Sequence, residues 1–312
     1  MLPRPRIGGL IDILTSTMTT SAEYRYEVDD LTVTEEMRRD FRQFGYIMVR
    51  NFFDSDDLRQ VKQVIEDNDE IVKRAFGVSD GAGRESKMCL WNHPGNDVTG
   101  MVSRCEKTVN TCEGLLGGEV YHYHTKLMMK NPRTGGSHLW HQDYGYWYKN
   151  GCLFPDMMTV FIAIDKCVKE NGCLQILRGS HKCGRINHVM VAGQTGADVE
   201  RVEAIQNSGQ CPLEKVEMEP GDALFFHCNL LHTSTGNDSD LRRWAFLCSY
   251  NKASNDPVIK HHHPQYTRIK KVSNSAIREC TNFTDMTGKD FMDPTKDATI
   301  RVEKSTNNQQ IK

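Results

Sequence analysis

Residues 137–148 have the sequence SHLWHQDYGYWY, in which one residue separates His141 from Asp143. On an extended strand, residues i and i+2 project to the same face. An imidazole and a carboxylate at this spacing can therefore bind one metal ion from the same side. A second imidazole from elsewhere in the chain completes a two-histidine, one-carboxylate triad, the arrangement typical of non-haem iron(II) oxygenases.

The candidate for the second imidazole is His232, which ends the stretch EPGDALFFHCNLLH over residues 219–232. The triplet PGD and the later run GNDS are turn signals on either side of a strand. We expect the chain to return as an antiparallel hairpin that brings Arg243 near the metal. A guanidinium binds a carboxylate through two parallel hydrogen bonds. Arg243 can therefore hold one end of a dicarboxylic co-substrate such as 2-oxoglutarate, whose other end chelates iron.

Short apolar runs surround these motifs and are separated by clusters of Gly, Pro, Asn and Asp. They span residues 119–129, 158–164, 174–177, 213–218, 223–226 and 244–250. No helix of 10–15 residues is predicted between successive runs. This disfavours a parallel βαβ sheet and favours a mainly β sandwich or barrel with flanking helices.

Two helices are predicted before this β-rich part. Thr34 can cap the first, which Gly45 ends, and a strand follows at residues 46–49. The second begins at Asp54 or Ser55 and ends near Gly77.

Three regions differ in composition from the predicted core. Residues 1–30 are polar and are expected to form a flexible N-terminal arm, and residues 78–100 are glycine-rich and are expected to be irregular. Residues 276–312 are expected to form a polar C-terminal tail. One domain is expected over residues 31–275, with its β core at about 118–252.

The composition is that of a soluble globular protein. The 312 residues include 39 Lys and Arg and 41 Asp and Glu, a net charge of −2, which argues against a nucleic-acid binder. No apolar run is long enough for a membrane span. The 11 cysteines include no C-x-x-C pair and fit neither a zinc knuckle nor a disulfide scaffold. A cytoplasmic protein is expected, with an organellar signal in the hydroxyl-rich N-terminus as the alternative.

Several motifs, in order, resemble the phytanoyl-CoA dioxygenase family of Fe(II)/2-oxoglutarate oxygenases, which also includes ectoine hydroxylase. They are HTKLMMKNP, HLWHQDYGYWY, ENGCLQILRGSHKCGR and EPGDALFFHCNLLHTSTGNDSDLRR, and the opening EMRRDFRQFGYIMVRNFFDSDDL is similar as well. The resemblance spans about residues 34–270. It implies a double-stranded β-helix core, which is a cupin-like jelly-roll, with flanking helices.

The resemblance also implies roles for individual residues. The iron ligands and catalytic centre are His141, Asp143 and His232, and the implied co-substrate contacts are Arg243, Ser234, Gln142 and Lys126. Asp143 occupies the position at which related halogenases have a small residue, so the resemblance favours hydroxylation or another oxidation over halogenation. The implied reaction consumes O2 and 2-oxoglutarate, releases succinate and CO2, and hydroxylates a small or medium organic substrate such as an acyl-CoA, an amino acid or a secondary metabolite.

Other histidines and aromatic residues have more than one interpretation. Tyr144 and Trp147 either contact the substrate or belong to an aromatic packing cluster. His122 and His124, expected on one strand face, are a rival metal-binding pair or ordinary strand residues. The run at 261–263 either contacts an anionic group or belongs to a solvated basic loop.

Two other functional classes remain open at this point. One is a zinc-dependent hydrolase or lyase on a cupin-like barrel that uses the same triad to activate water. The other is a non-catalytic jelly-roll binding module. The sequence indicates a small-molecule partner, with no nucleic acid or membrane, and does not indicate the substrate or the oligomeric state.

Overall fold

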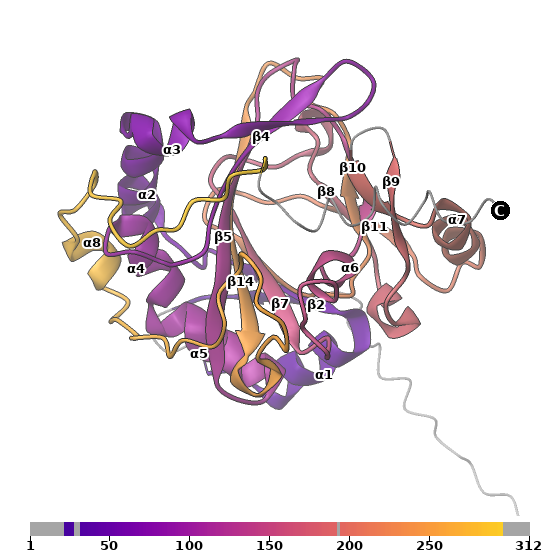
Figure 1. Ribbon diagram of the computed structural model, residues 1–312, viewed down its shortest axis with the longest axis horizontal. Helices are drawn as coiled ribbons and strands as arrows, with labels where there is room; N and C mark the ends of the chain where they lie inside the picture. Colours follow the sequence, from indigo (N-terminus) through magenta and orange to yellow (C-terminus); the bar gives the residue numbers. More distant parts are fainter. Residues whose placement is uncertain (1–21, 28–31, 192–193, 296–312) are drawn as a thin grey trace, which may run out of the picture.

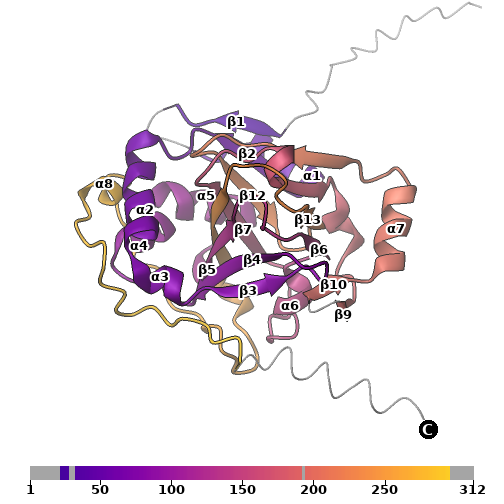
Figure 2. The ribbon, with the colours of Figure 1, turned by 90° about the horizontal axis from the view of Figure 1, so that it is seen from above.

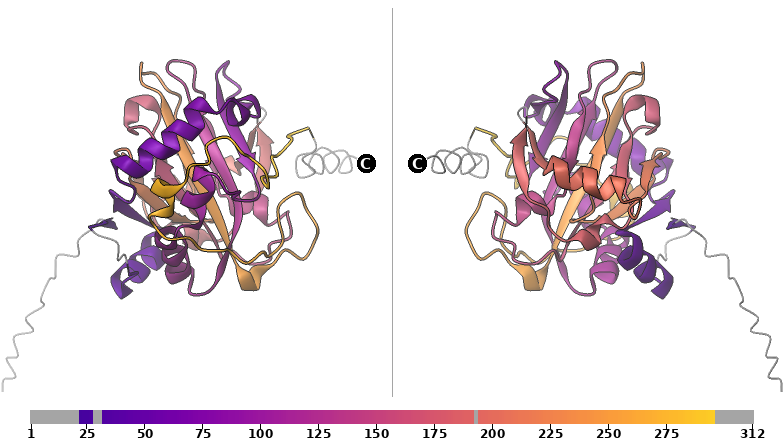
Figure 3. Two further views of the ribbon diagram at one scale, coloured as in Figure 1. Left: turned by 90° about the vertical axis from the view of Figure 1, so that its left-hand side faces the viewer. Right: turned by 90° about the vertical axis from the view of Figure 1, so that its right-hand side faces the viewer.

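The computed structural model describes residues 22–27, 32–191 and 194–295 (Figure 1). These residues form a mainly β structure with helices around a large sheet. Figures 1 and 2 show α2, α3, α4 and α8 on one side of that sheet and α7 on the other. In Figure 3, the side of the sheet with α2, α3, α4 and α8 faces the viewer in the left view, and the side with α7 faces the viewer in the right view.

The large sheet has eight strands in the order β1-β2-β12-β7-β14-β5-β4-β3. In that order the strands span Glu23–Arg25, Tyr46–Arg50, Ala223–His227, Met157–Ala163, Arg243–Lys252, Val120–Lys130, Glu85–Trp91 and Phe76–Ser79. β1 pairs with β2 in parallel, and every other neighbouring pair is antiparallel. Side chains on alternate positions therefore face either the helices or the small sheet.

The smaller sheet has four strands in the order β11-β8-β13-β6, all paired antiparallel. They span Leu213–Val216, Leu174–Leu177, His232–Ser234 and His138–His141. A separate pair, β9 (His188–Val191) and β10 (Gln194–Ala197), lies next to it. The Gln194 side chain joins β10 to β6 by accepting a hydrogen bond from the Leu139 N–H.

The helices are mostly short. They are α1 (Glu35–Phe44), α2 (Ser55–Asp67), α3 (Asp69–Lys73), α4 (Val98–Arg104), α5 (Glu106–Leu116), α6 (Tyr144–Trp147), α7 (Val199–Asn207) and α8 (Ala276–Glu279). Short 3-10 helices lie at Lys169–Asn171, Ser180–Cys183 and Ala253–Asn255. α1 has the predicted ends, since the Thr34 hydroxyl accepts the Met37 N–H and Gly45 ends the helix at a φ of 84°.

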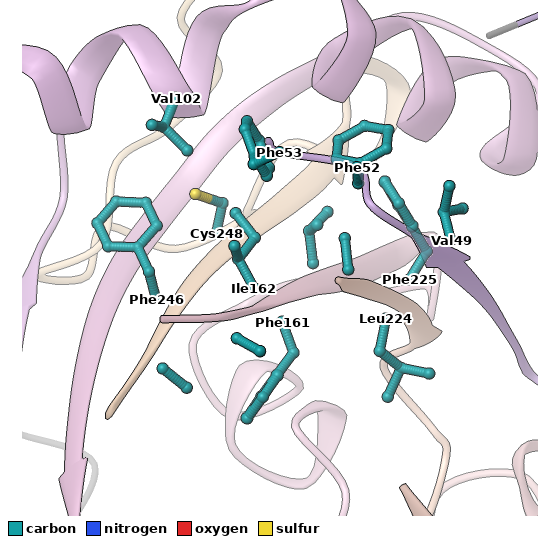
Figure 4. Packing of buried hydrophobic residues seen from close by; sticks show 14 of the residues in the cluster. Val49, Phe52, Phe53, Val102, Phe161, Ile162, Leu224, Phe225, Phe246 and Cys248 are labelled. Carbon is teal, nitrogen blue, oxygen red and sulfur yellow. The ribbon is translucent and has the colours of Figure 1, made fainter. Parts of the chain in front are cut away.

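The main hydrophobic core lies between the large sheet and the helices. Phe52, Phe53, Val102, Phe225 and Cys248 are among its buried members (Figure 4). Burying a phenylalanine of this kind contributes roughly 1.5–3 kcal/mol. This core makes the large sheet a rigid support for the side chains on its other face.

All six predicted strand runs are strands, with ends shifted by a few residues. The second predicted helix ends early, because Asn68 interrupts it and caps α3 by accepting the Glu70 N–H. The irregular segment expected at residues 78–100 is also a wrong prediction, because it contains the end of β3, all of β4 and the start of α4. Gly81, Gly83 and Gly95 lie between these elements, and Gly100 lies within α4.

Parts of both expected terminal segments pack on the fold. Within residues 1–30, β1 pairs with β2, and residues 1–21 and 28–30 lie outside the described residues. In the predicted tail, Lys289 forms a 3.0 Å ion pair with Asp97, and Phe291 forms an isolated antiparallel β-bridge with Trp91. Residues 296–312 lie outside the described residues.

Among the described residues, no helix is both long enough and apolar enough to cross a membrane.

Candidate active site

His141 and His232 lie opposite each other on two neighbouring strands. His141 ends β6 and His232 begins β13, and the two are direct partners in the antiparallel register. Their ring centroids are 4.0 Å apart. Asp143 follows β6, and the ligand atoms of the three side chains lie within 4.8 Å of one another. A single metal ion can therefore contact all three.

Both imidazoles have their Nε2 atom available for the metal ion, because Nδ1 is hydrogen-bonded elsewhere. His141 Nδ1 lies 2.8 Å from the Leu139 carbonyl oxygen, and His232 Nδ1 lies 2.9 Å from that of Leu230. Because a carbonyl oxygen only accepts, each Nδ1 carries the proton and each Nε2 keeps its lone pair. Burial lowers the pKa of both rings, so they are neutral near pH 7. Two neutral imidazole nitrogens are thus ready to bind a metal.

Asp143 is held as a carboxylate. Its Oδ2 accepts a 2.8 Å hydrogen bond from the Thr159 hydroxyl, and its Oδ1 lies 3.6 Å from Lys126 Nζ. Burial acts to raise the pKa of Asp143, but the Lys126 ammonium and the hydrogen bond from Thr159 act against it, and the pKa is lowered. Two neutral imidazoles and one carboxylate are the donor set of a facial triad that suits iron(II).

The three side chains line a cavity of about 460 Å³. Its wall includes residues of β5, β7 and β14 on the large sheet and of β6 and β13 on the small one. Arg243, Ser234 and Lys126, which were predicted to contact the co-substrate, all line it, as does Trp147. The structure therefore brings most of the predicted site into one space.

One end of the cavity is lined by the buried guanidinium of Arg243. Arg243 and Lys130 are direct neighbours on β14 and β5, and both are buried. Lys130 donates a 2.8 Å hydrogen bond to the Ser234 hydroxyl, and Arg243 donates a 2.7 Å bond to the Gly172 carbonyl. Arg243 Nε has no hydrogen-bond partner among the described residues. Burial, together with the neighbouring Arg243 charge, lowers the pKa of Lys130 well below its usual value. Buried charges without a counter-ion are costly, so this end is suited to an anion.

Comparison with known proteins agrees with this geometry. The family model described as "Phytanoyl-CoA dioxygenase (PhyH)" matches residues 41–245. The chain belongs to the phytanoyl-CoA dioxygenase family. The match includes all three candidate ligands and Arg243.

Individual relatives of this PhyH-family protein are distant. An L-proline trans-4-hydroxylase from Streptomyces griseoviridis is 27% identical over 230 residues, 69% of this chain and 85% of the relative. An ectoine dioxygenase from Stutzerimonas stutzeri is 22% identical over 249 residues, 74% of this chain and 81% of the relative. A crystal structure of EctD from S. alaskensis with bound Fe has a TM-score of 0.64 at 19% identity and covers 80% of this chain and 91% of that one. The last similarity shows a shared fold.

Two local geometries of this PhyH-family site differ from prediction. Asp143 was expected on an extended strand, but β6 ends at His141 and Asp143 has helical φ and ψ angles of −56° and −38° at the start of α6. The carboxylate reaches the imidazoles because the chain turns there, not because side chains alternate along a strand. The predicted hairpin is also wrong, since His232 lies on β13 of the small sheet and Arg243 on β14 of the large one. The connection crosses between sheets, and the two side chains meet across the cavity.

Gln142 and Tyr144 lie outside the cavity wall. The Gln142 amide donates to the carbonyls of Gly184 and Asn229 and accepts the Ile186 N–H, so it ties backbone segments together. Tyr144 donates to the Cys152 carbonyl within an aromatic cluster. Its neighbour Tyr146 lines the cavity.

The rival pair His122 and His124 does not share a face. Tyr123 has no partner on β14, because the register places Ser249 opposite His124 and Tyr250 opposite His122. This bulge reverses the alternation. His122 is hydrogen-bonded to the Asn92 carbonyl and to Thr125, whereas His124 lines the cavity. The two rings therefore do not form a metal-binding pair.

Lys130 and the histidine run at 261–263 were underestimated from the sequence. A lysine at the end of an apolar strand normally reaches solvent, and only the register with Arg243 shows that Lys130 is buried. His262 and His263 line the cavity, and His263 is buried, so a solvated loop is the wrong interpretation for these two residues. The available signal was that His124, Lys126 and Lys130 are separated by even numbers of residues, two and four, which places them on one face of a strand.

Proposed function

We propose that this protein is an Fe(II)- and 2-oxoglutarate-dependent dioxygenase that hydroxylates a small or medium organic substrate. The observation that carries the proposal is the meeting of His141 Nε2, His232 Nε2 and the Asp143 carboxylate in a cavity whose far end is cationic. Membership of the PhyH family supports it, and so does a neighbouring structure of EctD with 2-oxoglutarate and 5-hydroxyectoine.

The proposed ligands fit iron(II) by charge and donor type. His141, His232 and Asp143 supply two neutral nitrogens and one anionic oxygen and leave further coordination positions for a co-substrate. When bound, iron with 2-oxoglutarate and O2 supplies an oxidation that yields succinate and CO2 and adds one oxygen atom to the substrate. Thr159 fixes the carboxylate, and the carbonyls of Leu139 and Leu230 fix the ring orientations.

We assign the distal carboxylate of 2-oxoglutarate to the cationic end. Arg243 offers a guanidinium fork with an unpartnered Nε, and Lys130 holds the Ser234 hydroxyl beside it. An anion bound here compensates the buried charge of the Arg243 guanidinium. Lys126 lies instead beside Asp143, so we place it near the metal and not at this anchor.

We also propose that the two sheets together form the jelly-roll of the family. The large and small sheets both contribute strands to the cavity wall, as a double-stranded β-helix requires. Gln142 then acts as a positioning residue, since its amide fixes the turn that carries Asp143.

The test is succinate formation from 2-oxoglutarate by purified protein supplied with Fe(II), Zn(II) or no metal. The proposal predicts succinate only with Fe(II) and only with O2. A zinc hydrolase or lyase, whose donor set is similar, would show no consumption of 2-oxoglutarate. Absence of both Fe(II) and 2-oxoglutarate binding would favour the non-catalytic module.

A further inference from the structure

The cavity contains a second polar region on the other side of the metal ligands from Arg243. His124 lies there on β5, is 1% exposed and lines the cavity. Neither of its ring nitrogens has a hydrogen-bond partner among the described residues. An unpaired buried polar group costs free energy, and a bound ligand that pairs with it removes that cost.

The His124 ring is held in place by its neighbours. Its centroid lies 5.5 Å from that of Trp147 and 4.8 Å from that of His263. His263 is itself fixed, because its Nδ1 lies 2.9 Å from Asn92 Oδ1. The unpartnered nitrogens therefore belong to an ordered ring in a packed wall.

Lys126 adds a positive charge beside this ring. It lies two residues further along β5 on the same face, about 7 Å away along the strand. Its ammonium is 3.6 Å from Asp143 Oδ1. A metal bound to Asp143 compensates the carboxylate charge, which leaves the ammonium able to pair with another anion. Leu90 and Leu247, its partners on the adjacent strands, line the cavity on either side.

The charged residues that line the cavity also favour an anionic substrate over a cationic one. Among the described residues that line it, the charged side chains are Lys126, Lys149, Arg243 and Asp143. Asp143 is the only carboxylate in that set, and we assign it to the metal. A substrate cation would have no other partner there, whereas an anion would.

We propose that this region binds a small substrate through a carboxylate group, and this inference rests on the proposed function. One carboxylate oxygen accepts from the Lys126 ammonium and the other from the imidazole N–H of His124. The carbon body of the substrate lies against Leu90, Leu247 and Trp147. A cavity of about 460 Å³ that also holds 2-oxoglutarate suits a compact substrate.

The test compares carboxylates with neutral molecules of the same shape. Full-length protein is loaded without oxygen with Fe(II) and saturating 2-oxoglutarate, which occupies Arg243. It is titrated calorimetrically with pentanoate, benzoate and N-acetylglycine and with the three corresponding primary amides. We expect the carboxylates to bind at least about ten-fold more tightly, the usual effect of a charge-assisted hydrogen bond.

Two variants separate this site from a general charge effect. Lys126→Met is expected to remove the preference for carboxylates. Lys87 is exposed and lies on the face of β4 that points away from the cavity, so Lys87→Met is the control. This variant is expected to retain the preference for carboxylates. His124→Phe is expected to weaken carboxylate binding about ten-fold. It should also raise the melting temperature of the metal-free protein, because it removes two unpaired buried nitrogens.

The possible failures are distinguishable. If wild-type protein does not take up Fe(II) and 2-oxoglutarate, the proposed function fails and this inference fails with it. If the loaded protein binds carboxylates and amides equally, or binds neither, only the substrate inference is overturned. A lower melting temperature for His124→Phe would show that the ring has a structural role and would also overturn it.

Discussion

His141, Asp143 and His232 are held by hydrogen bonds that leave one ligand atom of each free. We predict that His232→Ala and Asp143→Ala each abolish 2-oxoglutarate turnover and lower Fe(II) uptake, because two ligands do not hold the metal. Circular dichroism should show an unchanged fold. The control is His93→Ala, which lies outside the cavity wall. Iron-dependent succinate formation by either ligand variant would remove that residue from the metal site.

Arg243 and Lys130 should act on co-substrate binding. Arg243→Ala is expected to raise the apparent Kd for 2-oxoglutarate by about 100-fold, because loss of a buried charged partner costs about 2–5 kcal/mol. Lys130→Met should have a smaller effect of the same sign. Both are measured by titration of the Fe(II)-loaded protein without oxygen. An unchanged affinity in Arg243→Ala would move the distal carboxylate to another place.

At the level of single residues, the sequence was sufficient to identify candidate site residues where a short motif includes the metal-binding or anion-binding side chains. The spacing of His141 and Asp143 and the distance from His232 to Arg243 identified the metal ligands and the guanidinium as candidates. Lys130 was missed because its burial depends on a partner 113 positions later in the chain, as 243 − 130 gives. The pairing that exposes this relationship is not visible from local periodicity.

At the level of elements, a buried ion pair is one of the contacts that hold the C-terminal segment 285–295 on the fold. Lys289 and Asp97 are 3.0 Å apart, and both side chains are fully buried. Lys289→Met leaves the Asp97 charge without its partner, so we predict a loss of about 3–5 kcal/mol in the free energy of unfolding. Urea denaturation measures it.

The control for this prediction is an exposed ion pair. Lys166 and Glu219 are 2.6 Å apart, with more than half of each side chain exposed. Lys166→Met should therefore cost less than about 1 kcal/mol. Equal losses for Lys166→Met and Lys289→Met would contradict the structural role of the C-terminal segment.

Individual strands were predictable, but their assignment to sheets was not. Short apolar runs located β5, β7, β8 and β14 because most of the side chains on these strands are buried. The hairpin prediction failed because neighbouring strands in sequence, β13 and β14, join different sheets. Local pattern also could not detect the bulge at Tyr123, which moves His122 out of the cavity. Such errors come from non-local pairing, which determines the faces on which side chains lie.

At the level of the whole molecule, the buried histidines predict an acid-sensitive fold. Burial lowers the pKa of His122 and His227 to about 3 and that of His188 to about 4. The unfolded chain therefore binds more protons below about pH 6.5, so the free energy of unfolding falls as the pH falls from there toward 4. Each such ring contributes up to about 1.4 kcal/mol per pH unit.

Urea denaturation of the metal-free protein at several pH values between 7.5 and 4.5 measures this slope. His227→Asn should reduce it, because the amide oxygen can accept the Asn229 N–H bond that His227 Nδ1 now accepts. If the free energy of unfolding does not change with pH over this range, the prediction is wrong. The histidines would then have similar pKa values in the folded and unfolded states.

The central claim is that one ferrous ion binds to His141, His232 and Asp143 while 2-oxoglutarate spans from it to Arg243. A crystal structure of the protein grown without oxygen with Fe(II) and 2-oxoglutarate tests it most directly. We expect electron density for a metal at the two Nε2 atoms and the carboxylate, and for a co-substrate carboxylate at the guanidinium. A metal bound elsewhere, or a co-substrate that does not reach Arg243, would contradict the account.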